Sequence, residues 1–130
     1  MSELSCRVCH RSPAANVRFH GHQGMLILMR FSRLDGPFCR DCGLAAYRDL
    51  SADTMVRGWW GVFSLFATAG VLVLNTARRG RVAALPEPQR ERNERTMDPG
   101  KPLLDRTAAY GLLVPALLLV FVGWSLVNGG

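Results

Sequence analysis

Two long uncharged apolar stretches divide the second half of this 130-residue chain. Residues 1–57 mix polar and apolar side chains, 58–76 are apolar, 77–107 are charged and contain prolines, and 108–127 are apolar again. A helix needs about 20 predominantly apolar residues to cross a bilayer. The pattern therefore predicts a polar head over 1–57, a first membrane helix over 58–76, a linker over 77–107 and a transmembrane helix over 108–127.

The second apolar segment is the stronger candidate for a membrane span. It has no charge, and Trp124 stands near one end, where an indole ring prefers the membrane interface. Pro115 is tolerated in a membrane helix. We expect residues 108–127 to span the bilayer.

The first apolar segment, GWWGVFSLFATAGVLVLNT, is weaker because Ser64, Thr68 and Asn75 interrupt it. Its insertion is expected either as a full span or as a re-entrant segment. Side chains suited to the membrane interface flank the two segments, namely Arg57, Trp59, Trp60 and Trp124.

Within the head, the pattern predicts a hairpin and a helix. Residues 16–20 alternate as a short strand, residues 21–24 contain two glycines that suggest a turn, and residues 25–31 form a more buried strand. The run LAAYRDL over 44–50 has helical spacing of its apolar residues. The expected fold is a small α+β head of the zinc-ribbon or treble-clef kind, followed by two apolar α-helices.

Two Cys-x-x-Cys pairs provide the only strong chemical signal. Cys6 and Cys9 precede the predicted hairpin, and Cys39 and Cys42 follow it at the start of the predicted helix. Two such pairs can close a tetrahedral site, so we expect the four sulfurs to bind Zn²⁺. A head of this size buries little apolar surface and benefits from a structural metal. Two disulfides, or thiol redox cycling, remain alternatives.

The three histidines are expected to lie outside this site. His10 directly follows Cys9, and adjacent residues rarely point at one metal. His20 and His22 lie around the predicted turn, where we interpret them as polar turn residues. No carboxylate close to them in sequence completes a second metal site.

Charge gives conflicting indications about topology. Residues 77–107 carry eight basic and five acidic side chains, and basic residues favour the cytoplasmic side. If both apolar segments span, the cysteine head lies on the opposite side from this linker. Reduced cysteines belong in the cytoplasm, and Met1–Ser5 lead into Cys6 without the apolar core of a signal peptide. We therefore expect a cytoplasmic head.

The segments CRVCHRSPAANVRF, GHQGMLILMRF and GPFCRDCGLAAYRDLSADTMVRGWWG resemble a family of small bacterial membrane proteins with no assigned biochemical function. The resemblance covers about residues 6–80, and the block from GPFCRDCG to GWWG is its specific part. The segment FATAGVLVLN departs from the family by lacking a proline. The resemblance implies a zinc-ribbon-like head at the bacterial inner membrane.

No residue set in the sequence indicates catalysis. There is no Ser/His/Asp set and no glycine-rich phosphate loop, and four cysteines leave a zinc ion no open position. We expect a non-enzymatic, membrane-anchored zinc module that binds an unidentified protein as an adaptor or regulator, with the lipid bilayer as its other partner and no small-molecule substrate. The net charge of +6 keeps a nucleic-acid-binding zinc module as an alternative, beside a thiol redox protein or sensor.

Overall fold

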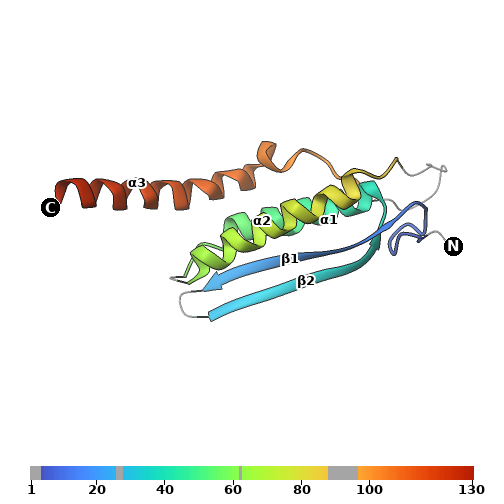
Figure 1. Cartoon of the computed structure of the whole chain (residues 1–130), viewed down its shortest axis with the longest axis horizontal. Helices are drawn as coiled ribbons and strands as arrows, with labels where there is room; N and C mark the ends of the chain where they lie inside the picture. Colours follow the sequence, from blue (N-terminus) through green and yellow to red (C-terminus); the bar gives the residue numbers. More distant parts are fainter. Residues whose placement is uncertain (1–3, 26–27, 62, 88–96) are drawn as a thin grey trace.

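The computed structural model describes residues 4–25, 28–61, 63–87 and 97–130. Along the chain, the elements are β1 (Ala15–Met25), β2 (Leu28–Phe38), α1 (Arg40–Arg57), α2 (Ser64–Ala83), the 3₁₀ helices η1 (Leu103–Asp105) and η2 (Thr107–Leu112), and α3 (Leu113–Asn128). The hairpin and the α1–α2 pair lie lengthwise against each other (Figure 1). The cysteine end of the head therefore lies opposite the end formed by the hairpin tip and the α1–α2 turn.

The hairpin is longer than the sequence pattern predicts. β1 and β2 pair antiparallel without interruption from Ala15 opposite Phe38 to Met25 opposite Leu28. The predicted turn at residues 21–24 was wrong, because these residues lie inside β1. Gly24 serves close approach instead: a Cβ there would collide with the Ser64 hydroxyl and the Gly58 carbonyl.

The helix predicted after the second cysteine pair is confirmed as α1. Cys39 is its N-cap, and the Cys39 sulfur accepts the backbone N–H of Cys42 at 3.5 Å. The Tyr47 ring packs against Phe19 of β1, with ring centroids 5.9 Å apart. These contacts form the core of the head.

The expected first membrane helix over residues 58–76 is not shown. α2 begins at Ser64 within this segment, packs on β1 and α1, and does not meet the test of length and apolarity for a span. The buried positions of α2 recur at helical spacing and are mostly small or polar: Ser64, Thr68, Val71, Asn75 and Val82. The Asn75 side-chain oxygen accepts the backbone N–H of His20 at 2.8 Å, and its amide donates to the carbonyl of His20 at 2.6 Å. This segment packs on the head because its buried side chains share one face and because Asn75 pairs with the free edge of β1 at His20.

The predicted linker over 77–107 is partly structured. Residues 77–83 continue α2, residues 88–96 lie outside the described part of the chain, and residues 97–106 lie along α1. The Arg48 guanidinium donates to the carbonyls of Pro99 and Gly100, and Arg106 pairs with Asp49 at 2.8 Å. These contacts fix the segment that leads into η2.

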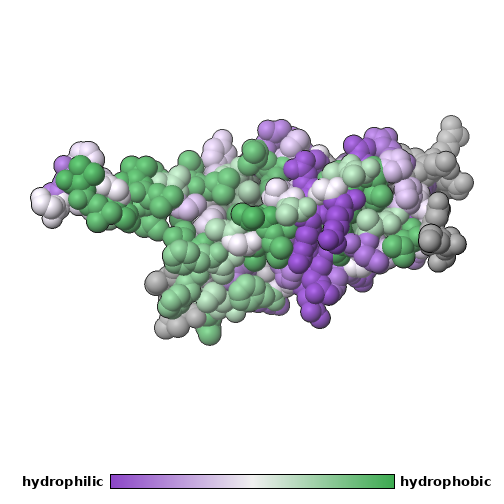
Figure 2. All heavy atoms as spheres, viewed as in Figure 1, coloured by the Kyte–Doolittle hydropathy of each residue, from purple (hydrophilic) through white to green (hydrophobic). Residues whose placement is uncertain are grey.

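The second apolar segment forms a free helix. Residues Thr107–Asn128 are long and apolar enough to cross a membrane, and no other helix of the described residues meets that test. None of α3 is buried against the head. Figure 2 shows apolar side chains gathered along α3 and over the adjoining end of the head, whereas hydrophilic residues gather over the middle of the molecule.

Candidate metal centre

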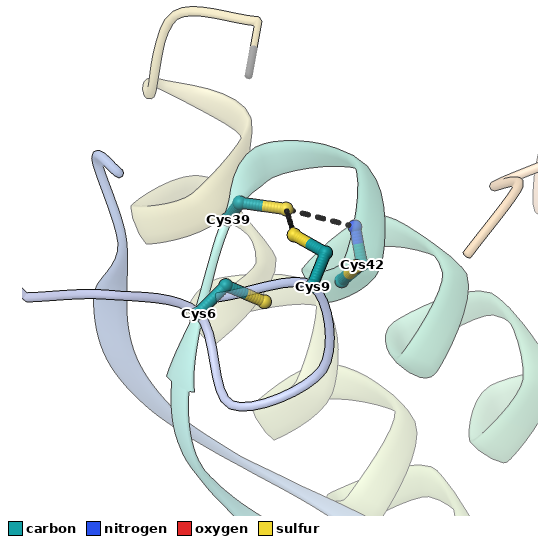
Figure 3. Close-up of side chains that lie close together, drawn as sticks. All are labelled: Cys6, Cys9, Cys39 and Cys42. Atoms are coloured by element: carbon teal, nitrogen blue, oxygen red, sulfur yellow. Dashed lines mark hydrogen bonds between the residues drawn. The ribbon is translucent and has the colours of Figure 1, made fainter. Parts of the chain in front are cut away.

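The four predicted ligands meet at the cysteine end of the head. Cys6 and Cys9 lie in the loop before β1, Cys39 follows β2, and Cys42 lies in the first turn of α1. Their sulfur atoms all lie within 4.8 Å of one another, and all four residues are at least 95% buried. Figure 3 shows the four side chains converging from these segments.

Backbone hydrogen bonds bring the two cysteine pairs together. The carbonyl of Cys6 accepts the N–H of His10, and the N–H of Cys6 donates to Arg11, both at 2.8 Å. This loop is joined to the end of β2 by the Arg7 N–H, which donates to Pro37 at 2.9 Å. The hairpin therefore carries Cys39 to the loop that holds the first pair.

Burial and backbone dipoles act in opposite directions on the thiols. Burial raises the pKa of Cys39 to about 11 and also raises the pKa of Cys42. At Cys6, burial raises the pKa, but backbone hydrogen bonds from Cys9, Cys39 and Val8 outweigh it and bring the pKa down to about 7. A buried cluster in which all four cysteines are thiolates therefore needs a cation at its centre.

The spacing of the sulfurs fits a tetrahedral metal ion. Metal–sulfur bonds of about 2.3 Å place neighbouring sulfurs of a tetrahedron about 3.8 Å apart. The Cys9 and Cys39 sulfurs are 3.6 Å apart, and none of the four cysteines forms a disulfide. The donor set and its dimensions thus match a four-thiolate metal site, as predicted.

The surroundings of the cluster are closed. Val82, near the end of α2, is completely buried, and a Cβ at Gly43 would collide with its side chain. The N–H of Met97 donates to the Cys42 sulfur at 3.4 Å. Segments from five parts of the chain thus meet around the four cysteines.

The histidines take no part in the cluster, but two of them are not turn residues. His10 is exposed, with φ of 58°. His20 lies in β1 with a ring nitrogen 3.1 Å from the Arg78 guanidinium, and burial and then Arg78 lower its pKa. His22 is completely buried, packs on Phe31, and has no hydrogen-bond partner for either ring nitrogen among the described residues.

The residues expected at the membrane interface lie in two places. Arg57 ends α1 and pairs with Asp53 at 3.2 Å, and Trp59 and Trp60 follow at the α1–α2 turn. Trp124 lies on α3 and is 69% exposed. Three of the four are therefore at the end of the head that is remote from the cysteines.

Comparisons of the chain with protein-family models, with curated proteins and with solved structures give no significant match. The function proposed below rests on the cysteine cluster and on α3.

Proposed function

We propose that the protein is a non-enzymatic zinc module anchored in a membrane by α3, where its head serves as an adaptor for another protein. The observation that supports it best is the closed cluster of four buried cysteine sulfurs. A four-cysteine shell leaves zinc no position for a substrate, so the metal acts on folding and not on a reaction.

Zinc is the metal proposed because of the ligand type and geometry. Thiolates select soft or borderline metals, and a compact tetrahedral set of four sulfurs suits Zn²⁺. The metal would hold the N-terminal loop, the end of β2 and the start of α1 together.

Burial weighs against the thiol redox alternative. Thiol–disulfide exchange requires a thiolate that another sulfur can reach, yet the four cysteines are between 0% and 5% exposed. No comparable observation favours a nucleic-acid partner over a protein partner.

A single span removes the conflict over topology. Because α2 packs in the head, the head and the basic linker lie on the same side of α3. The positive-inside rule and the need for reduced thiols then both favour the cytoplasm. We place the head on the cytoplasmic face of a bacterial inner membrane.

Elemental analysis tests the metal. The full chain, purified in detergent under reducing conditions, should contain one zinc per chain, and Cys39→Ser should lose it. His10→Ser is the control, because His10 is exposed beside the cluster and should keep the zinc. Finding iron, or no metal, in the reduced protein would contradict the proposal.

Accessibility of tags tests the topology. Epitope tags at Ser2 and near Pro88 should both be protected from a membrane-impermeant reagent in intact cells, whereas a tag after Gly130 should react. Labelling at Ser2 from outside would refute the cytoplasmic head.

A further inference from the structure

One end of the head is apolar on the outside and polar on the inside. Its exposed apolar residues come from the hairpin tip, the α1–α2 turn and the first turn of α2, and they are 42% to 77% exposed: Met25, Leu28, Met29, Phe31, Trp60, Phe63 and Phe66. We call this set the apolar end. Behind it, Thr54, Ser64, Thr68 and His22 are completely or almost completely buried. Such a reversed distribution suits a surface in contact with lipid and not with water.

We propose that the apolar end inserts into the same bilayer leaflet that α3 enters, so that the head is seated in the membrane at two places. This inference rests on the proposed function, because it takes α3 as the membrane span.

The position of the membrane boundary along the head follows from the way η2 packs on α1. η2 packs on α1, and Gly111 lies so close to Met55 that a Cβ there would collide with the Met55 carbonyl. At about 1.5 Å per residue, the 17 residues from Gly111 to Asn128 cover about 26 Å, close to the hydrocarbon thickness of about 30 Å. The membrane boundary must therefore lie near Gly111, at the level of Met55.

The apolar end lies beyond that level. The Arg57 end of α1, the α1–α2 turn and the hairpin tip point in the direction that α3 takes (Figure 1). Two further α1 residues and the turn extend past Met55, which corresponds to about 5–10 Å, the usual depth of an interfacial insertion. A bilayer placed around α3 therefore covers the apolar end as well.

The two indole N–H groups at this end have hydrogen-bond partners within the chain. The Trp60 indole N–H donates to the Val56 carbonyl at 2.8 Å, and the Trp59 indole N–H donates to Met55 at 2.7 Å. Both rings can face lipid without losing a hydrogen bond to water. A groove of about 490 Å³ between Trp60 and the hairpin tip, lined by Gln23, Gly24, Met25 and Arg57, offers space for part of an acyl chain.

Tryptophan quenching by brominated lipids tests the insertion. The full chain is reconstituted in vesicles of phosphatidylcholine and phosphatidylglycerol, with Trp59→Phe and Trp124→Phe so that Trp60 is the only tryptophan. Lipids brominated near the headgroup end of the chain should quench the Trp60 emission, because an interfacial insertion reaches about 5–10 Å into the bilayer. A second form, with Trp59→Phe and Trp60→Phe, reports on Trp124 in α3.

Two leucines give a matched pair of variants. Leu28 at the hairpin tip is 71% exposed and Leu104 in η1 is 70% exposed. Leu28→Glu should abolish most of the Trp60 quenching, and Leu104→Glu should leave it unchanged. Zinc content checks that each variant is folded.

The outcomes separate this inference from the proposed function. Quenching of Trp124 without quenching of Trp60 overturns the insertion and leaves the anchor intact, and no quenching of either overturns the anchor. If Trp60 is shielded from iodide but not quenched by bromolipid, the apolar end is covered by a second copy and the inference is wrong. Photoactivatable lipid on the unmodified chain should label residues 28–31 and 63–66, and labels confined to α3 overturn the inference independently of any variant.

Discussion

The two apolar helices, α2 and α3, both come from apolar stretches of the sequence and have opposite surroundings. α2 buries a stripe that includes Ser64, Thr68 and Asn75 against β1 and α1, whereas α3 buries nothing. The difference lies in where the polar side chains stand. In α2 they share one buried face, and Asn75 pairs with the backbone of His20 in β1. The α3 residues from Leu117 to Val122 carry no polar side chain. The position of a few polar residues, and not total apolar content, separates a packed helix from a free one.

Removing the metal should cause the largest loss of folding stability, and of the two apolar helices it should affect α2 and not α3. Structural zinc supplies about 10–16 kcal/mol of folding free energy in zinc-finger peptides. Because Val82 of α2 packs against Gly43 beside the cluster, chelation under reducing conditions should expose α1 and α2 to hydrogen exchange. α3 should stay protected in the bilayer. Restored zinc should reverse the change, and unaltered protection of α2 would contradict a structural metal.

The effect of Asn75→Leu on stability should be opposite for a membrane-spanning α2 and for an α2 packed in the head. In a membrane span it would favour insertion, but here it removes both hydrogen bonds to the His20 backbone. These two backbone groups are partly buried, and leaving them unpaired should cost at most about 6 kcal/mol, since an unpaired buried group costs about 1–3 kcal/mol. Hydrogen exchange of the β1 amides in micelles measures the loss.

Ala77→Leu is the control for that variant, because Ala77 is exposed on the same helix. It adds similar apolar surface and removes no hydrogen bond. A gain in protection of β1 on Asn75→Leu would show that α2 does not use its polar face as described.

A matched pair of valines compares the outer surfaces of the two helices. Val120 of α3 is 69% exposed and Val73 of α2 is 70% exposed. Val120→Lys should weaken insertion by about 3 kcal/mol, because it places a charge near the centre of the span. Val73→Lys should have little effect on membrane attachment, because Val73 lies about 13 Å along α2 from Ser64 and outside the apolar end. Extraction by alkaline carbonate measures both, and equal release would mean that α2 enters the membrane as deeply as α3.

The cysteine site could be predicted from the sequence because its information is local. The spacing of Cys39 and Cys42, with a helix directly after them, defines half of the site, and the hairpin brings up the other half. The apolar helix α3 was equally predictable from its uninterrupted apolar run. Neither prediction requires knowledge of long-range packing.

The surroundings of α2 and the hairpin turn could not be predicted because they depend on contacts between distant segments. Gly21 and Gly24 suggested a turn, but Gly21 leaves room for Ser32 of β2 and Gly24 leaves room for Ser64 of α2. Asn75 reduced the apolar character of its segment, but its structural role is to pair with the backbone of His20, 55 residues away. The recurrence of Ser64, Thr68 and Asn75 on one helical face was the signal that could have indicated a packed helix.

His22 should give the smallest effect, a dependence of stability on pH that belongs to the packed region alone. Burial lowers the pKa of His22 below its ordinary value of 6.5, so the unfolded chain takes up a proton at a pH where the folded head does not. Its contribution to stability is therefore complete above about pH 6.5 and is lost as the pH falls toward the lower folded pKa. As the pH falls from about 7.5 to about 5.5, the β1 amides should lose protection from hydrogen exchange. His22→Phe, which can still pack on Phe31, should make this loss smaller. His10→Phe makes the same replacement at an exposed position and serves as the control. Zinc content must be followed in parallel, since acid also competes with the metal for thiolates. An identical pH dependence in the His22→Phe chain would show that this histidine is not sealed in the head as the structure places it.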